Sequence, residues 1–176
     1  VHGVEHVFCV PGESYLAALD AFHDRPIKLT VCRQEGGATM MAEAVGKVTG
    51  RPGVVFVTRG PGATNASPGF YIARQDSAPL IVFVGQIARD MREREAFQEL
   101  DYRAVFGTMA KWATEIDDPA RIPEIAAHEL TALLERQTRR LERLEAEYEK
   151  AVAILEARVR AAYIDEPPDV LAFLVS

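Results

Sequence analysis

Short apolar runs bounded by turn residues recur along the chain. Helix-compatible segments at residues 14–22 and 38–49 separate the first of them. Uninterrupted apolar strands that alternate with helices are typical of a parallel sheet, because its strands are buried on both faces. The pattern therefore predicts a three-layer α/β/α fold with a mostly parallel sheet of about six strands. The clear runs lie at residues 7–10, 29–32, 54–58 and 80–84, and weaker ones lie at 112–116 and 170–175.

The pattern changes after Gly107. Asp118 and Pro119 are typical of a helix N-cap followed by the first helical residue, and neither glycine nor proline interrupts residues 124–164. Within this segment an apolar residue recurs at every seventh position, and others widen the stripe. We therefore expect a long C-terminal helix or a helical hairpin. The repeating positions are Leu134, Leu141, Tyr148, Leu155 and Ala162, and the stripe adds Leu130, Leu144, Val152 and Val159.

The length of this segment bears on which of the two arrangements forms. A single helix over residues 119–163 would be about 65 Å long at about 1.5 Å per residue, which exceeds the span of a domain of this size. A final strand at 170–175 would then not rejoin the sheet easily. We therefore favour a break near residues 137–140, with the second helix covering a face of the sheet. A single helix that pairs with another chain is the alternative.

Composition limits the classes of function. The chain of 176 residues fits one domain with a sizeable core. Lys and Arg total 20 against 26 for Asp and Glu, and the formal net charge of -6 argues against a nucleic-acid or anionic membrane surface. No apolar stretch has the length of a membrane helix. Cys9 and Cys32 lie in apolar runs as buried hydrophobes, which indicates a reducing, cytoplasmic compartment.

Two corners between a strand and a helix carry the candidate chemistry. The run at 29–32 leads into Glu35 beside two glycines, and the next run leads into Gly60, Pro61 and Gly62. Parallel strands end at one edge of the sheet, where open α/β folds bind ligands, so we expect both corners there. Taken alone, each corner has a simpler interpretation: the glutamate stabilises a helix N-terminus, and the glycines make a tight turn.

Five segments, spread in order over most of the first 130 residues, carry a resemblance to a known family. They are Val7-Phe8-Cys9-Val10-Pro11-Gly12-Glu13-Ser14, the Glu35 corner, Thr58 to Asn65, Gln75-Asp76-Ser77, and Ile81-Val82-Phe83-Val84-Gly85-Gln86. No one of them is diagnostic alone. Together they resemble the pyrimidine-binding (PYR) domain of thiamine-diphosphate enzymes, in the acetolactate synthase branch. The resemblance implies a PYR-like α/β domain over residues 1–130.

The C-terminal part departs from this family. Residues 131–164 look like an inserted or redesigned amphipathic helical segment, and residues 165–176 look like the turn and final strand of the same domain. The helix that normally precedes the positions matching residues 3–7 is also missing. These departures lead us to expect a fragment or an engineered domain, and an unusual natural variant is the alternative.

The resemblance implies roles for residues at both corners. In these enzymes a glutamate hydrogen-bonds the aminopyrimidine ring of thiamine diphosphate and favours the imino form that removes the thiazolium C2 proton. The matching residue is Glu35, which we predict to be catalytic. Thr58, Gly60, Pro61 and Gly62 are predicted to bind the cofactor, because they form the corner against which the flat ring lies.

Other matching positions extend the predicted site or depart from it. Phe97 and Gln98 match positions that line the substrate pocket of a neighbouring active site. The simpler alternative is a solvated charged segment with one buried aromatic residue. Gln34 stands where the family commonly has histidine, and Cys9 stands where it usually has glycine, so the resemblance gives neither residue a role.

One feature that the chain lacks limits its function. The family binds the diphosphate through a divalent metal held by a Gly-Asp-Gly corner of a second domain, and the sequence contains no Gly-Asp-Gly. We therefore expect no metal site, no magnesium bound by this chain, and weak or absent binding of thiamine diphosphate by the chain alone. Activity is expected only with a diphosphate-binding domain as partner.

These observations lead to one main interpretation and two alternatives. We interpret the chain as an isolated or redesigned PYR domain derived from a thiamine-diphosphate-dependent carboligase, with transferase or lyase ancestry. One alternative is a non-enzymatic scaffold used for self-association, and the other is the small subunit of a two-subunit 2-oxo-acid decarboxylase. PYR domains pack against other domains, so we expect a homodimer or higher homo-oligomer, without nucleic-acid or membrane partners.

Overall fold

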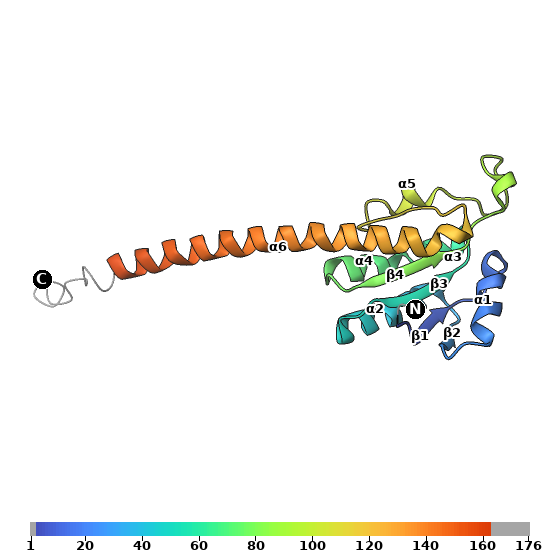
Figure 1. The fold of residues 1–176 in the computed structure, drawn as a ribbon, viewed down its shortest axis with the longest axis horizontal. Helices are drawn as coiled ribbons and strands as arrows, with labels where there is room; N and C mark the ends of the chain where they lie inside the picture. The colour runs from blue at the N-terminus through green and yellow to red at the C-terminus, as the bar shows by residue number, and fades with distance from the viewer. Residues whose placement is uncertain (1–2, 163–176) are drawn as a thin grey trace, which may run out of the picture. The chain divides into compact units, whose positions relative to one another are not determined.

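The structure is a computed structural model that describes residues 3–162 (Figure 1). The chain divides into two compact units, Val1–Asp117 and Asp118–Ser176, and each is described here by itself. The first unit contains a four-stranded parallel sheet with helices between its strands. The second contains a short 3-10 turn, η3 (Pro119–Arg121), and a 39-residue helix, α6 (Ile122–Arg160). The finer division predicted at residues 130 and 164 stays a prediction.

The sheet has the strand order β2-β1-β3-β4, and all three pairings are parallel. The four clear apolar runs of the sequence form these strands to within one residue, so the parallel α/β fold is confirmed. The strands are β1 (His6–Cys9), β2 (Lys28–Val31), β3 (Gly53–Val57) and β4 (Leu80–Val84). The other elements of the first unit are η1 (Glu13–Tyr15), α1 (Leu16–His23), α2 (Glu35–Thr49), α3 (Pro61–Asn65), α4 (Ser67–Gln75), η2 (Arg89–Met91) and α5 (Tyr102–Phe106).

The prediction of about six strands is wrong, because the described residues form four. Residues 112–116 are irregular rather than a strand. Their apolar run is short and contains Thr114 and Glu115, and the Glu115 carboxylate forms an ion pair with Arg92 instead of extending the sheet. The sixth predicted strand, residues 170–175, lies outside the described residues.

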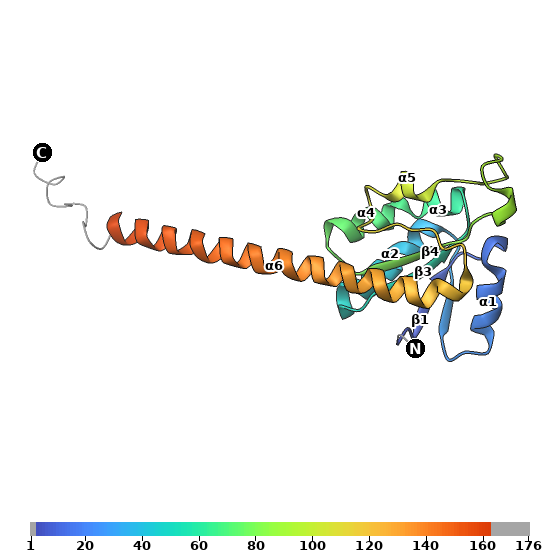
Figure 2. The ribbon, with the colours of Figure 1, turned by 45° about the horizontal axis from the view of Figure 1, so that its top comes forward.

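Alternating side chains of β3, a strand drawn with its neighbours as a ribbon in Figure 2, divide the interior of the first unit between the two faces of the sheet. Val55 and Val57 are fully buried against Ala38 and Ala42 of α2. Phe56 points to the opposite face, where its ring stacks on Phe83 with centroids 4.6 Å apart and meets Phe22 of α1 at 5.3 Å. Helices α2 and α1 therefore cover opposite faces of the sheet. Full burial of a valine side chain contributes about 1.5–3 kcal/mol, so β3 anchors both layers.

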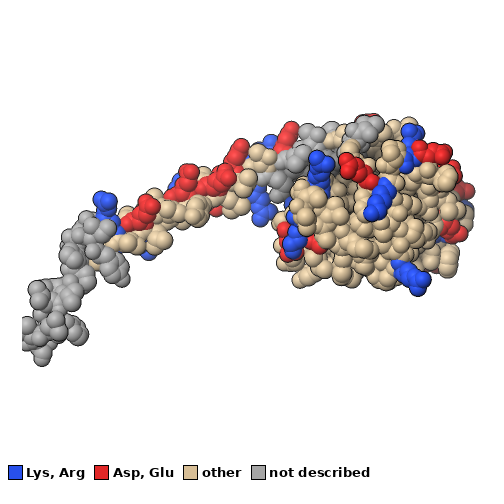
Figure 3. Space-filling model, turned by 90° about the horizontal axis from the view of Figure 1, so that it is seen from below, with Lys and Arg blue, Asp and Glu red and all other residues tan. Residues whose placement is uncertain are grey.

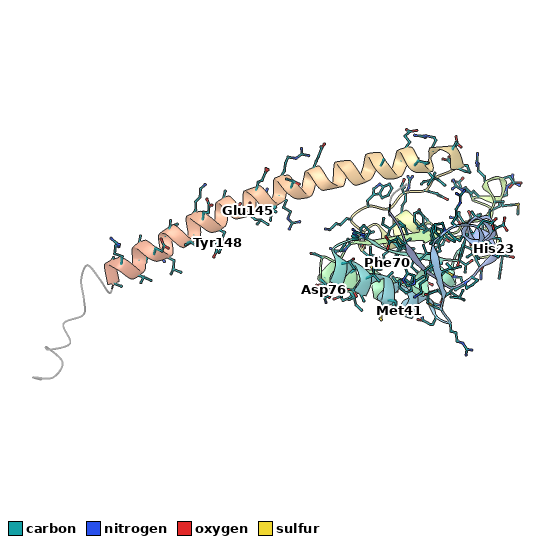
Figure 4. The ribbon with its side chains drawn as sticks, turned by 60° about the horizontal axis from the view of Figure 1, so that its bottom comes forward. His23, Met41, Phe70, Asp76, Glu145 and Tyr148 are labelled. Atoms are coloured by element: carbon teal, nitrogen blue, oxygen red, sulfur yellow. The ribbon has the colours of Figure 1, made fainter. Side chains whose placement is uncertain are left out.

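Close backbone contact fixes α2 against the sheet. A Cβ on Gly53 would lie 1.7 Å from the carbonyl oxygen of Ala42, so only glycine lets the start of β3 come this near the helix. The helix ends at Gly50, whose φ of 67° is the left-handed conformation that glycine adopts at helix C-termini. Helix α4 packs beside α2, and Phe70 of α4 stacks on Phe106 at 4.8 Å (Figure 4).

The second unit corrects one expectation and confirms another. Asp118 caps η3 by accepting a hydrogen bond from the Ala120 amide at 2.9 Å, as the sequence predicted. Helix α6 continues without a break through residues 137–140, so the favoured helical hairpin is wrong. Residues 137–140 contain no glycine or proline that would break the helix. Two ion pairs between residues four apart support the helix around this segment, Arg139 with Glu135 at 3.9 Å and Arg143 with Glu147 at 3.8 Å.

Candidate functional site

Three corners meet at the carboxyl edge of the sheet. Strand β1 lies between β2 and β3, so the corner after β1 separates the two corners predicted to carry the chemistry. Contact is tight there: a Cβ on Gly12 would lie 2.4 Å from Cβ of Thr58, and the hydroxyl oxygens of Ser14 and Thr58 are 2.9 Å apart. The parallel strand order thus gathers both predicted corners at one edge.

Glu35 is the first residue of α2. Its position is fixed by the residue before it, because Gln34 has an extended backbone and its side-chain oxygen accepts a hydrogen bond from the Gly37 amide at 2.7 Å. The carbonyl of Glu35 accepts from the Thr39 hydroxyl at 2.7 Å. An N-capped helix start therefore holds this carboxylate at the sheet edge.

The half-buried carboxylate of Glu35 faces the Gly-Pro-Gly corner. Its Oε2 accepts a hydrogen bond from Nδ2 of Asn65 at 3.3 Å. Its Oε1 lies 3.4 Å from the point that a Cβ on Gly62 would occupy. The structure thus brings together Glu35 and Gly62, which were predicted as separate parts of one site.

The corner after β3 is built from four predicted residues. Gly60 has φ 56° and ψ -116°, a conformation that L side chains rarely adopt, and Pro61 begins α3. The space beside Gly62 is filled by Thr58, because a Cβ on Gly62 would lie 2.6 Å from Cγ2 of that threonine. The Gly60 amide donates a hydrogen bond to the Tyr102 hydroxyl at 2.9 Å.

The loop that carries Phe97 and Gln98 lies against this corner. A Cβ on Gly60 would lie 2.8 Å from Cβ of Gln98 and 2.9 Å from its carbonyl oxygen, so Gln98 covers that glycine. Phe97 accepts a hydrogen bond at its carbonyl from Nε of Arg59 at 3.2 Å, while its side chain is 77% exposed. The alternative of a buried aromatic residue in this segment therefore does not hold for Phe97. Arg59 is further held by an ion pair with Glu13.

A carboxylate inside the loop organises its backbone. Glu99 accepts hydrogen bonds from the amides of Glu93 at 2.6 Å and Ala96 at 3.0 Å. These backbone donors lower the pKa of Glu99. Glu93, Glu95 and Gln98 all have positive φ, so the loop carries backbone conformations that non-glycine residues seldom adopt. The Glu99 carboxylate stabilises this loop conformation by accepting the hydrogen bonds of the Glu93 and Ala96 amides.

The electrostatics of the region come mainly from acids and buried hydroxyls. Burial raises the pKa of Tyr102 and also that of Tyr15, so both hydroxyls stay protonated at neutral pH. An open depression of about 530 Å³ lies beside the loop. Its lining consists of Glu93, Glu95, Ala96, Glu99, Leu100 and Asp101. Within residues 3–162, no group of three or more His, Cys, Asp and Glu side chains has the arrangement of a metal site.

Sequence reasoning gave no role to three residues that shape the site. Asn65 stands at the end of the motif used for the resemblance, and its short amide side chain was the available signal. Ser14 likewise ends the first motif segment and hydrogen-bonds Thr58. Tyr102 lies in a helix outside every motif. Its hydroxyl accepts a hydrogen bond from the Gly60 amide, and the sequence carries no signal for that contact.

The residues at the edge fit one end of thiamine diphosphate. Glu35 presents a carboxylate with one oxygen held by Asn65 and the other beside Gly62, which suits a hydrogen bond to a ring nitrogen. The sequence has no Gly-Asp-Gly, and the described residues contain no acidic cluster with the arrangement of a metal site.

Comparisons with known proteins agree on the region that matches. Residues 1–105 match the family described as thiamine pyrophosphate enzyme, N-terminal TPP binding domain. The acetolactate synthase of Bacillus subtilis (strain 168) is 41% identical over 122 residues, which cover 69% of this chain and 21% of that protein. The acetolactate synthase large subunit of Lactococcus lactis subsp. lactis is 43% identical over 124 residues, covering 70% and 22%. The chain thus spans about a fifth of the length of these relatives.

In the described part of the chain no helix has the length and apolar character needed to cross a membrane.

Proposed function

We propose that this chain, which belongs to the thiamine pyrophosphate enzyme family through its N-terminal TPP binding domain, supplies the pyrimidine-binding half of a thiamine diphosphate site. The observation that carries the proposal is the position of the Glu35 carboxylate. It lies at the N-terminus of α2, accepts a hydrogen bond from Asn65, and directs Oε1 toward Gly62 at the carboxyl edge of the sheet. Open α/β sheets bind their ligands at this edge.

In this proposal each residue at the edge has a distinct task. Glu35 holds a proton in a hydrogen bond with a nitrogen of the aminopyrimidine ring. Thr58, Gly60, Pro61 and Gly62 orient that ring, because their compact corner brings backbone rather than side chains toward it. When bound, the cofactor would supply the electron sink for a reaction of a 2-oxo acid, and these residues would supply its position and a proton at the ring nitrogen.

Phe97 and Gln98 are proposed to line a substrate pocket. Gln98 already covers Gly60, and Phe97 presents a side chain that is 77% exposed. An exposed aromatic ring beside a candidate site suits contact with an apolar substrate group or with a neighbouring domain. The hydrogen bond from Arg59 to the Phe97 carbonyl ties this loop to the corner.

The chain is proposed to be inactive until a diphosphate-binding domain completes the site. A neutral ring in an open half-site makes few contacts, whereas metal-bridged phosphates supply much of the attachment of such a cofactor. No metal-binding group of acids occurs among the described residues. We propose acetolactate synthase-like carboligation as the reaction of the completed site, since the relatives at 41% and 43% identity carry that name.

Pyruvate consumption tests this proposal. The chain is incubated with pyruvate, thiamine diphosphate and magnesium, beside a Glu35→Gln variant that keeps the side-chain size and removes the acid. We expect no consumption by either protein, because residues 1–176 contain no Gly-Asp-Gly corner that could hold the metal and the diphosphate. Consumption by the wild-type chain that Glu35→Gln abolishes would overturn the claim that the chain is only half of a site.

A further inference from the structure

An apolar stripe runs along the C-terminal half of α6 and is open to solvent. Leu155 is 62% exposed and Tyr148 is 71% exposed. The other exposed members are Leu141, Leu144 and Val159, and Val152 is half-buried. Among the described residues of the second unit the only elements are η3 and α6, so no other element of that unit covers the stripe. Six apolar side chains in one row are more than scattered surface hydrophobics require.

The spacing of the stripe is that of a helix that pairs with another helix. Successive members from Leu141 to Val159 are three or four residues apart. Within and beyond the stripe, one apolar row recurs at every seventh position: Leu134, Leu141, Tyr148, Leu155 and Ala162. A row that repeats every seven residues over four heptads keeps a seam on one side of a supercoiled helix.

The charges beside the stripe differ on its two sides. In the heptad whose first position is Leu141, Tyr148 and Leu155, Glu145 is the charged residue of one flank, which we call the acidic flank. Arg140 lies on the other flank, which we call the basic flank and which also carries Ile154 and Glu147, itself paired with Arg143 at 3.8 Å. Figure 3 shows acidic side chains along one side of α6 with uncharged surface beside them. Figure 4 marks Tyr148 of the stripe and Glu145 of the acidic flank.

These flanks favour one orientation of a partner helix. In a parallel pair of identical helices the left flank of one helix faces the right flank of the other, so the acidic flank meets the basic flank. Over residues 140–159 this arrangement sets Arg140 against Glu145 of the second copy and places no like charges opposite each other. Like charges across a helix interface are unfavourable, so the pattern suits a parallel pair.

We propose that the stripe of α6 is a parallel, in-register pairing surface for a second copy of this chain. In that arrangement Arg140 of one copy lies opposite Glu145 of the second copy, and Ile154, which is 57% exposed, lies opposite Val159 of the second copy. The interface is isologous, since both copies contribute the same surface. It goes beyond the proposed cofactor half-site and does not depend on it, because no residue of the pyrimidine corner takes part.

The first test measures the mass of the chain by light scattering at concentrations on the order of tens of micromolar, where specific dimers of ordinary affinity persist. We expect a dimer for the wild-type chain and a monomer for Leu155→Glu, which places a charge inside the seam. Ala153→Glu adds the same charge on the exposed opposite side of the same helix and should remain a dimer. Far-UV circular dichroism confirms that α6 stays helical in both variants.

The second test exchanges the flanking charges. Arg140→Glu and Glu145→Arg should each weaken dimerisation at least tenfold, and the double exchange should restore it, because only the parallel register sets these two positions against each other. These surface changes leave the seam intact, so they decide the question even if Leu155→Glu unfolds the helix. A monomeric wild-type chain, a dimer indifferent to Leu155→Glu, or a double exchange that fails to restore pairing would each overturn the proposal.

Discussion

Asn65 donates a hydrogen bond from Nδ2 to Oε2 of Glu35 across 3.3 Å. The two residues are 30 positions apart in the sequence and belong to different helices, α3 and α2. This contact leaves Oε1 as the oxygen directed at Gly62. The orientation of the acid in the candidate site therefore depends on a neutral amide, and substitutions at position 65 report on it.

Replacing Asn65 should affect stability in a charge-dependent way. Asn65→Ala removes one exposed hydrogen bond to a carboxylate and should lower the free energy of unfolding by about 0.5–1.5 kcal/mol. Asn65→Asp sets two carboxylates side by side, so it should destabilise the chain more than alanine at pH 7. Salt screens that repulsion, so the difference between the two variants should shrink at high ionic strength. Urea unfolding at low and high salt measures it, and equal differences at both would contradict the contact.

Gly62 and Gly37 form a matched pair for testing the packing of the corner. A Cβ on Gly62 would lie 2.6 Å from Cγ2 of Thr58, so Gly62→Ala should destabilise the chain by about 1–3 kcal/mol through overpacking. A Cβ on Gly37 meets only the side-chain oxygen of Gln34, at 3.8 Å. Gly37→Ala should therefore stabilise α2 by about 0.5–1 kcal/mol. Thermal unfolding of both variants checks that Gly62→Ala has the lower melting temperature. A Gly62→Ala variant as stable as the wild-type chain would show that the corner is packed more loosely than in the structure.

The Glu99 loop should respond to acid. Backbone donors hold the pKa of Glu99 below its ordinary value of 4.5, so the charged form is favoured in the folded chain. The stabilisation is present above that ordinary value and is lost as pH falls through the lower folded pKa. We expect the amide proton shifts of Glu93 and Ala96 to titrate together with a midpoint below 4.5. Glu99→Gln should remove the transition, and a midpoint above 4.5 would contradict the hydrogen bonds.

Particular residues show why much of the fold could be predicted from the sequence. Residues 54–58 form one apolar run because β3 is central and both of its faces are buried, so the run indicates a parallel strand without knowledge of its neighbours. The helix-compatible segment at 38–49 leaves out the first three residues of α2, two of which are glycines, although Glu35 was expected at the start of a helix. Residues 112–116 also have apolar side chains, but the ion pair of Glu115 with Arg92 was not visible locally.

The residues of the candidate site could be predicted from the sequence, but the contacts between them could not. Glu35 and the Gly60 corner follow two strands, and the parallel order places strand ends at one edge. The contact of Gln98 with Gly60 joins residues that neither periodicity nor spacing relates. The favoured break in α6 failed for a different reason. It assumed that the helix had to return to its own sheet, although the sequence contains no residue that would end the helix there.

Amide chemical shifts during a titration with thiamine diphosphate test the central claim most directly. The account predicts saturable shifts confined to residues 34–37 and 58–62, with a dissociation constant on the order of millimolar because only the ring end is held. Glu35→Gln should weaken this binding by at least several-fold. Shifts centred elsewhere, shifts that Glu35→Gln leaves unchanged, or no shifts at cofactor concentrations on the order of tens of millimolar would contradict a pyrimidine half-site at this edge of the sheet.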